Sequence, residues 1–452
     1  FGSRLEVLKV GRSMMQAVFA RHEPLHHAPV MMQFQNPPVV TPVQQPAPSF
    51  TPQPARLPAP PPKLEGMLKN REVLKGHVYQ AFQAAGGAGG ANGLDKPHFR
   101  TFVAKLAECV GVSPNVFSCP DDQHMRFDFN GTGLLKPDEL YKFAFFNLAK
   151  YWRTAASSGA LSVSSGIPRK TISAAGYRVV KELGAGAQGG AKLAVHTTTG
   201  QEVCIKVIAK MSAQQVGMAQ LQDEYLCQRL TAADHVLKMQ EIFQDNQNFY
   251  MISEPYHGGD LTTLAKRSRQ QGVTLNGAWW KNIFRQGLNA LFHLHGHAMM
   301  HCDIKEPNMM VKSSDFKQPH ICLIDFGIAR AMADESTETC GTPGYIPPET
   351  WNTGKWFPKG DCFSWGVCMV QMMADKLPPL GARTAFSPGG IFLEGCATFP
   401  EIQNATRNRQ PPFHLMQPQD RAIVTLASKC LSKLPRGRPT SKQGLNDPGL
   451  VA

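Results

Sequence analysis

The sequence predicts an α+β fold, in which short β-rich segments precede a long helical part and an all-α region lies upstream of both. The β-rich segments occupy residues 177–183, 192–196, 202–208 and 249–254. Helical periodicity dominates the residues that follow them, and strands followed by helices indicate an α+β architecture. Upstream, apolar residues recur at helical spacing between residues 64 and 152, and two loops that contain glycine interrupt them. This pattern predicts two consecutive helix–loop–helix units.

Length and charge limit the organisation of the chain and the partners that it is expected to bind. Its 452 residues exceed the roughly 250–300 that one hydrophobic core organises, so we expect two or three domains. The net charge of +13 is spread along the chain without a basic block, which favours a solvated surface over a functional basic patch. We therefore predict no nucleic-acid partner. No apolar run reaches the length of about 18 residues that indicates a transmembrane helix.

Cysteine usage bears on the compartment. The 11 cysteines occur singly, without a CxxC pair, which is typical of a reducing environment and predicts a cytoplasmic protein. Because the chain begins with Phe1, membrane association through an upstream N-terminus is left open by the sequence.

Shifts in composition divide the chain into four parts. Residues 1–63 are rich in proline and are predicted to be disordered, either as a plain linker or as a ligand for a proline-binding domain. The helical segment 64–152 follows, and a flexible linker rich in Ser, Ala and Gly is predicted at 153–172. The last part, 173–445, contains the β-rich segments and the motifs described next.

A glycine-rich loop joins the first two predicted strands. Its glycines Gly184, Gly186 and Gly189 allow backbone amides to approach phosphate oxygens without obstruction by Cβ atoms, and Ala185 lies between the first two. A Rossmann turn has the same glycine spacing, but its glycines open a helix, whereas this segment continues as a strand through Ala191. The loop is therefore interpreted as a flap over ATP.

A lysine follows in the next apolar strand. Lys206 lies in the segment Val-Cys-Ile-Lys, and the predicted helix after it carries an acid able to pair with it. Glu224 is the favoured partner and Asp223 the alternative, because the register of this helix is not determined by the sequence.

The segment 301–308 carries the strongest signal for chemistry. Transfer of a γ-phosphoryl group needs a carboxylate that orients the acceptor, a nearby cation and an amide oxygen for Mg²⁺. Asp303, Lys305 and Asn308 supply these groups in that order. Further on, an apolar strand ends at Asp325, whose carboxylate can bind Mg²⁺ that bridges the β- and γ-phosphates.

This order of motifs resembles the eukaryotic protein kinase family over residues 177–438. The resemblance implies a bilobal fold with a β-rich N-lobe and an α-rich C-lobe, with protein substrates, ATP and Mg²⁺. It also implies that Asn308 and Asp325 are the Mg²⁺ ligands. Lys305, together with Gly-Thr-Pro before Tyr345, matches the Ser/Thr type rather than the Tyr type.

The same resemblance assigns roles at the nucleotide base and in the helical lobe. Ser253 is the gatekeeper, and Glu254 to Tyr256 offer backbone hydrogen bonds to adenine. Farther along the chain, Glu349 resembles the structural acid at the end of the activation segment. Arg438 resembles the late arginine that pairs with this acid.

Three positions depart from the family pattern. Cys302 stands where the family has an arginine that ordinarily pairs with an activation-loop phosphate, which weakens the case for activation by phosphorylation of that loop. Glu306 and Pro307 invert the usual order and move a carboxylate that often binds basic substrate residues, so no basophilic preference is predicted. Ala191 replaces the usual valine and leaves less apolar cover over adenine. None of these changes removes a catalytic group.

A calcium site is predicted in the second upstream loop, at residues 128–139. This segment carries oxygen ligands at the positions of an EF-hand, and Gly133 allows its sharp turn. The earlier loop at 85–95 lacks ligand carboxylates and is interpreted as a degenerate hand, so an EF-hand pair is predicted at 64–152. The combination is similar to the calcium-dependent protein kinases of protists and plants, whose EF-hands follow the kinase domain. The predicted Ca²⁺ ligands are Asp128, Asn130, Thr132, the carbonyl of Leu134 and Glu139.

Together these patterns predict an active Ser/Thr protein kinase that uses ATP and Mg²⁺ and is modulated by Ca²⁺ through the EF-hand pair. The alternative is a calcium-responsive pseudokinase or binding scaffold. All five groups that a pseudokinase commonly lacks are present here, which favours the enzyme. They are Lys206, the helix acid, Asp303, Asn308 and Asp325.

Overall fold

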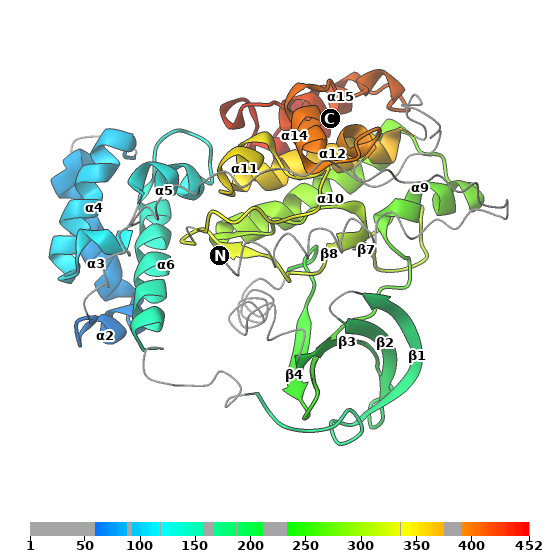
Figure 1. The fold of residues 1–452 in the computed structure, drawn as a ribbon, viewed down its shortest axis with the longest axis horizontal. Helices are drawn as coiled ribbons and strands as arrows, with labels where there is room; N and C mark the ends of the chain where they lie inside the picture. Colours follow the sequence, from blue (N-terminus) through cyan, green and yellow to red (C-terminus); the bar gives the residue numbers. More distant parts are fainter. Residues whose placement is uncertain are drawn as a thin grey trace, which may run out of the picture. The chain divides into compact units, whose positions relative to one another are not determined.

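The computed structural model describes most of the predicted helical and catalytic parts. Most of the predicted proline-rich region 1–63 lies outside the described residues, as does the middle of the predicted linker 153–172. Within the described ranges, no helix combines the length and the apolar character needed to cross a bilayer. These ranges are 59–87, 93–117, 119–156, 167–186, 189–210, 233–334, 336–374 and 390–451 (Figure 1).

Residues 64–156 form a helical module of two consecutive helix–loop–helix units. Its helices are α2 (Leu64–Lys69), α3 (Arg71–Phe82), α4 (Lys96–Val110), α5 (Pro120–Phe127) and α6 (Pro137–Ala156), with short turns η1 (Gln83–Gly87) and η2 (Pro114–Phe117). Leu94 and Leu135, one from each interhelical loop, form an antiparallel bridge. Each backbone N–H donates to the other residue's carbonyl at 2.9 Å, so the two loops are held side by side.

Aromatic side chains fill the interior of the helical module. The ring of Phe143 on α6 is buried, and its centroid lies 4.9, 5.4 and 5.5 Å from those of Phe99, Phe117 and Phe127. These three rings come from α4, η2 and α5, so one side chain joins most elements of the module. Asp95 begins α4 by accepting a hydrogen bond from the His98 N–H at 3.0 Å.

A five-stranded antiparallel sheet follows the helical module. It consists of β1 (Tyr177–Gly186), β2 (Gly189–His196), β3 (Glu202–Ala209), β4 (Met239–Gln244) and β5 (Asn248–Ser253), in the order β1-β2-β3-β5-β4 (Figure 1). Val203 and Ile205 of β3 are buried against Phe243 and Tyr250. Alternating β-branched residues in β3 therefore supply one apolar face, as a half-buried strand requires.

The rest of the chain is mainly helical, with two short β-ribbons. The ribbons pair β6 (Met299–Met300) with β9 (Arg330–Ala331), and β7 (Met309–Val311) with β8 (Ile321–Leu323). The helices before residue 375 are α9 (Leu261–Gln270), α10 (Gly277–Gly296), α11 (Pro348–Thr353) and α12 (Pro358–Met373). Those after residue 389 are α13 (Gly390–Leu393), α14 (Phe399–Asn408), α15 (Arg421–Cys430), α16 (Ser441–Leu445) and α17 (Pro448–Val451).

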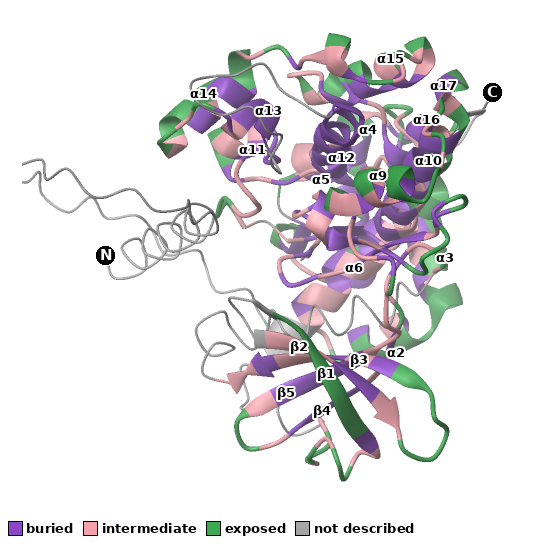
Figure 2. Ribbon diagram, turned by 90° about the vertical axis from the view of Figure 1, so that its right-hand side faces the viewer, coloured by how far each residue is buried: buried purple, intermediate pink, exposed green. Residues whose placement is uncertain are grey.

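Helix α12 lies at the centre of this lobe. Nearly all of its residues are buried, and Figure 2 shows the helix coloured as buried along its length. Helix α10 packs closely against it, because a Cβ atom at Gly287 would lie 2.1 Å from the ring of Trp365. A helix that is buried on nearly all sides is typical of the interior of a large lobe, and α12 therefore provides a rigid base for the catalytic loop.

The predicted α+β arrangement of a sheet followed by helices is confirmed, and each of the four predicted strands is present. Strand β4 (Met239–Gln244) was not predicted, because its residues MQEIFQ lack a clear alternation of apolar and polar side chains. Helix α6 ends at Ala156 rather than at the predicted boundary, residue 152.

Candidate active site

The loop between β6 and β7 carries the predicted catalytic residues, and α12 holds its start. The carboxylate of Asp361 accepts hydrogen bonds from the backbone N–H groups of His301 and Cys302, both at 2.9 Å. His295 of α10 contacts the same carboxylate at 3.0 Å. Asp361 is fully buried, so this fan of hydrogen bonds fixes the backbone that leads to Asp303.

Asp303 lies at the centre of a polar cluster. One carboxylate oxygen accepts hydrogen bonds from the N–H and the hydroxyl of Thr342, at 3.0 and 2.6 Å. The other oxygen lies 2.8 Å from the Lys305 ammonium and accepts from the Asn308 amide at 3.0 Å. Lys305 also donates to the Thr342 hydroxyl at 2.8 Å. The structure therefore brings the predicted residues Asp303, Lys305 and Asn308 together.

Thr342 belongs to this cluster but was not among the predicted site residues. It lies in the Gly-Thr-Pro segment, which the sequence pattern used only to distinguish the Ser/Thr type from the Tyr type. Its hydroxyl donates to Asp303 and accepts from Lys305, so it connects the activation segment to the catalytic loop. The Gly-Thr-Pro motif marks Thr342 as a residue of interest, but it does not show which carboxylate accepts a hydrogen bond from the threonine.

Asp325 forms an ion pair with Lys206, with 2.7 Å between Nζ and Oδ1. Burial raises the pKa of Asp325, but the charges of Lys206, His301 and Lys305 outweigh this effect and lower the pKa to about 2. The side chain is still 44% exposed, so it remains accessible to a ligand. Its φ of 63° is left-handed, a conformation that non-glycine residues adopt mainly at constrained sites.

The pairing of β7 with β8 brings Asn308 and Asp325 to one place. Met309 pairs with Leu323, and the Ile324 N–H donates to the Asn308 carbonyl at 2.9 Å. Among the described residues, no cluster of three or more His, Cys, Asp and Glu side chains is arranged around a metal position. A pair of protein ligands suits Mg²⁺, which usually takes its remaining ligands from phosphates and water.

The described residues of the predicted glycine loop lie at the paired ends of β1 and β2. Gly184 pairs with Ala191, Ala185 with Gly190 and Gly186 with Gly189 across this hairpin. In the next pair of strands Ala191 is opposite Lys206, so loop and lysine share one end of the sheet. The predicted acid Glu224 and its alternative Asp223 lie outside the described residues.

The segment after β5 contains the predicted contacts to adenine. Ser253 ends β5 opposite Cys204 of β3, and its hydroxyl donates to the carbonyl of Glu254 at 3.3 Å. The Glu254 carboxylate lies 3.1 Å from Lys312 and accepts from the Tyr256 hydroxyl at 3.2 Å. Burial raises the pKa of Tyr256 far above its usual value, so this phenol stays protonated. The carboxylate and the phenol therefore brace the segment.

Glu306 points into the protein rather than toward a substrate. It is buried and accepts hydrogen bonds from the Tyr345 hydroxyl and from the Gln371 amide, the latter at 2.6 Å. Burial raises the pKa of Glu306, although both hydrogen bonds oppose the shift. Glu306 therefore links the catalytic loop, the activation segment and α12.

The end of the activation segment is fixed by an ion pair. The guanidinium of Arg438 donates to both carboxylate oxygens of Glu349, at 2.6 and 2.7 Å. Arg438 is buried, and two parallel hydrogen bonds of this kind give strong geometric specificity. The pairing that the resemblance implied is confirmed.

Two thiols lie next to Asp303. Burial raises the pKa of Cys302, which has no exposed surface. A hydrogen bond with Cys302 lowers the pKa of Cys340, and the charge of Arg330 acts in the same direction against the effect of burial. Of the two thiols, Cys340 therefore has the lower pKa.

The predicted calcium loop connects α5 to α6. Asp128 accepts from the N–H groups of Thr132 and Gly133, at 3.0 and 2.9 Å. Buried Glu139, in the first turn of α6, accepts from the Asn130 amide at 2.7 Å, and burial raises the pKa of this carboxyl. A cation beside Glu139 would offset the cost of its buried charge. Binding of Ca²⁺ by this loop remains a prediction.

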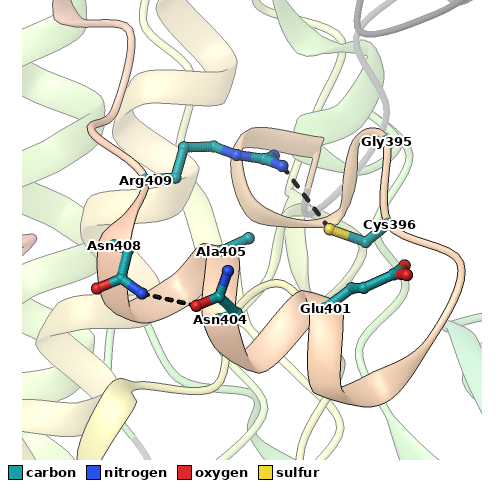
Figure 3. Close-up of a pocket in the computed structure, with 7 residues that line it drawn as sticks. All are labelled: Gly395, Cys396, Glu401, Asn404, Ala405, Asn408 and Arg409. Carbon is teal, nitrogen blue, oxygen red and sulfur yellow. Dashed lines mark hydrogen bonds between the residues drawn. The ribbon is translucent and has the colours of Figure 1, made fainter.

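A hollow in the helical lobe lies apart from these groups. In Figure 3 the side chain of Arg409 reaches Cys396, with 3.7 Å between Nη2 and Sγ, and Asn408 donates to Asn404 at 2.7 Å. The hollow lies between the end of α13 and α14 and contains no residue of the phosphate-transfer set. Its lining residues are Gly395, Cys396, Glu401, Asn404, Ala405, Asn408 and Arg409.

Comparison with known proteins agrees with this arrangement. The chain is similar to the carbon catabolite-derepressing protein kinase of Saccharomyces cerevisiae, with 30% identity over 211 residues, 45% of this chain and 31% of the relative. It is 30% identical over 209 residues to sucrose non-fermenting protein kinase 1 of Fusarium virguliforme, 45% of this chain and 28% of the relative. It is 26% identical over 206 residues to the SNF1-related protein kinase catalytic subunit alpha KIN12 of Arabidopsis thaliana, 45% of this chain and 40% of the relative.

The chain thus matches well under half of the length of these relatives. Residues 177–449 match the protein kinase domain family, and this range includes the sheet, the catalytic loop and the helical lobe. The match covers more than half of the chain, which therefore belongs to the protein kinase domain family.

Proposed function

We propose that this chain is a Ser/Thr protein kinase that transfers the γ-phosphoryl group of ATP to protein hydroxyl groups. The observation that carries the proposal is the cluster at Asp303, where a carboxylate, the ammonium of Lys305 and the hydroxyl of Thr342 meet within 3 Å of one another. Phosphoryl transfer depends mainly on positioning and on charge stabilisation, and this cluster supplies both.

Each group has a role in this proposal. Asp303 orients the acceptor hydroxyl and takes its proton, and Lys305 stabilises the charge on the transferred group. Lys206 binds the nucleotide phosphates. Bound Mg²⁺ would neutralise phosphate charge, and Asn308 and Asp325 are the residues that would hold it. Because the pKa of Asp325 is lowered to about 2, its carboxylate stays ionised throughout the physiological pH range.

Binding of the nucleotide is assigned to the β1–β2 hairpin and to the segment after β5. The turn of the β1–β2 hairpin covers the phosphates, Ala191 contributes apolar cover over adenine, and the backbone from Glu254 to Tyr256 supplies hydrogen bonds. The bracing of Glu254 by Lys312 and Tyr256 supports this role, because a fixed backbone loses less entropy when it binds a ligand.

Substitution of Asp303 tests the proposal. We expect Asp303→Asn to lower phosphate transfer from Mg-ATP to myelin basic protein by about a hundredfold or more, because general-base positioning contributes that much. The affinity for a fluorescent ATP analogue should change by less than about threefold. Asp315→Asn, at an exposed acid of the same lobe, is the matched control and should leave both properties unchanged.

The alternative is a calcium-responsive pseudokinase or binding scaffold. It predicts that the wild-type chain binds nucleotide but transfers no phosphate, with Asp303→Asn then indistinguishable from it. That result would reject the kinase proposal.

We also propose that Ca²⁺ modulates the kinase through the loop 128–139. Contacts between this loop and the helical lobe favour the idea. Lys442 of α16 donates to the Asn130 side-chain oxygen at 2.7 Å, and Gln443 donates to the Gly131 carbonyl at 3.1 Å. Asn130 is a predicted ligand, so Ca²⁺ and α16 compete for the same oxygen. Transfer rates in Ca²⁺ and in EGTA should then differ by about fivefold or more, whereas equal rates would reject modulation.

A further inference from the structure

Arg126, near the end of α5 in the helical module, is a buried cation that contacts the kinase domain. Only 2% of it is exposed. Its Nε donates to the Trp356 carbonyl at 3.2 Å. Its Nη1 donates to the carbonyl of Met332 at 3.1 Å and to that of Asp334. A guanidinium has several donors in a rigid fork, so one side chain can hold several carbonyl groups at fixed positions.

A second cation of the module contacts the same strip of backbone. Lys150 of α6 donates to the carbonyl of Ala333 at 2.7 Å. The carbonyl groups of three consecutive residues, 332–334, therefore each accept a hydrogen bond from a cation of the module. A hydrogen bond from a charged donor contributes more to stability than one between neutral groups. The hydrogen bonds that Arg126 donates are also buried.

Apolar packing extends the same interface. The hydrophobic core of the module continues without a break into the kinase domain, where it includes Cys302, Met332, Ile346 and Trp356. At the edge of the interface, the Asp122 carboxylate of α5 lies 2.6 Å from the Lys355 ammonium. The module and the activation segment thus share one core.

A short path leads from Arg126 to the reaction centre. Trp356 accepts from Arg126 through its carbonyl, and its indole N–H donates to the Cys340 carbonyl at 3.2 Å. Two residues later Thr342 donates twice to Asp303. Arg126 therefore holds one end of the segment 332–342 directly and the other end through Trp356, and this far end carries the threonine that contacts the catalytic carboxylate.

We propose that Arg126 is a positioning residue for phosphoryl transfer: the helical module inserts it into the kinase domain to hold the activation segment in its working arrangement without a phosphate. This inference rests on the proposed kinase activity and does not require that the loop 128–139 bind Ca²⁺. Cys302, which precedes Asp303 in the catalytic loop, is short, buried and uncharged. It therefore cannot act as the cation that holds the activation segment. The Asp303–Thr342 contact is present together with the Arg126 contacts, so docking of the module is compatible with an assembled site.

The test compares Arg126→Ala with the wild type in the full-length chain, using myelin basic protein and Mg-ATP. We expect kcat/KM for the protein substrate to fall by about tenfold or more, because the substituted group acts through Thr342 on Asp303. The KM for ATP should change by less than about twofold, because Lys206 and the glycine loop are untouched. A purely structural defect would lower kcat/KM for the protein substrate, raise the KM for ATP and lower the melting temperature. Guanidinium ion at millimolar concentration should restore part of the activity of Arg126→Ala and have no such effect on the wild type.

Arg100→Ala is the matched control. Arg100 lies on α4 of the same module, is largely exposed and pairs with Asp121, so its loss should leave the kinetics unchanged. If Arg126→Ala does not fold, Arg126→Lys retains the charge but not the fork, and the same fall in kcat/KM is expected. Unchanged or increased activity in the Arg126 variants would overturn the proposal, the latter indicating an inhibitory contact. An inactive wild type would instead reject the kinase activity itself.

Discussion

Single residues at the nucleotide site lead to a prediction about inhibitors. Ser253 is small and ends β5 opposite Cys204, so as the proposed gatekeeper it would leave the space behind adenine open. Bulky pyrazolopyrimidine inhibitors should therefore inhibit the wild type. Ser253→Met should raise the inhibitory concentration by about tenfold or more, because a large side chain would overlap the inhibitor. The concentration that halves phosphate transfer measures this effect.

The control for this prediction separates volume from hydrogen bonding. Ser253→Ala removes the hydroxyl that donates to Glu254 but keeps the space open, so its sensitivity should match that of the wild type. Equal inhibition of the wild type and Ser253→Met would show that residue 253 does not border the inhibitor.

The residues of the active site differ in how far the sequence predicts them. Asp303, Lys305 and Asn308 lie within one short loop, so their spacing alone predicts that they act together. Thr342 and Arg126 reach the same region from distant parts of the chain. Contacts of this kind depend on tertiary packing, which no local pattern records.

At the scale of elements, strand patterns were informative where one face is buried and less so elsewhere. Strand β3 alternates buried β-branched residues and was predicted, whereas β4 has a mixed pattern and was not. The second helix–loop–helix unit was predicted from the helical spacing of its apolar residues. The contact of this unit with the activation segment was not predicted, because the sequence around Arg126 does not differ from that of an ordinary exposed helix.

The link between three elements at Glu306 gives a prediction on stability. This carboxylate joins the catalytic loop, the activation segment through Tyr345 and α12 through Gln371. Glu306→Ala leaves both donors without their acceptor and should cost about 2–4 kcal/mol of unfolding free energy. Glu306→Gln keeps one acceptor and should cost about 1–2 kcal/mol. Urea denaturation measures both, with exposed Glu338→Gln as the control that should cost nothing measurable.

The pH dependence of this link follows from the raised pKa. A carboxyl whose pKa is higher in the folded state than in the unfolded state contributes its full stability below the unfolded pKa. That contribution is lost as the pH rises through the folded pKa. The difference in unfolding free energy between the wild type and Glu306→Gln should therefore be larger at about pH 5 than at about pH 8. An advantage that grows with pH would contradict the assignment of burial as the main cause.

At the scale of the whole molecule, the calcium loop and the kinase domain share one oxygen, the side-chain carbonyl of Asn130. While Lys442 donates to it, the loop lacks one of its predicted ligands. Coupling between two sites is reciprocal, so an interaction that hinders Ca²⁺ binding must itself be weakened by Ca²⁺. We therefore expect the Ca²⁺ affinity of the loop to depend on its contact with α16, and the strength of this contact to depend on the Ca²⁺ concentration.

Lys442→Met tests this coupling without altering a predicted ligand. Removal of the competing ammonium should tighten Ca²⁺ binding by about fivefold to thirtyfold, because a hydrogen bond to a charged donor contributes about 1–2 kcal/mol. Isothermal titration of the full-length chain with CaCl₂ measures the affinity. Lys433→Met, at a lysine that donates only to carbonyl groups of the helical lobe among the described residues, controls for the lost charge and should leave Ca²⁺ affinity unchanged. Glu139→Gln should abolish binding in either background, since it removes a charged ligand. Weaker Ca²⁺ binding in Lys442→Met would mean that α16 helps the loop to bind calcium instead of competing with it.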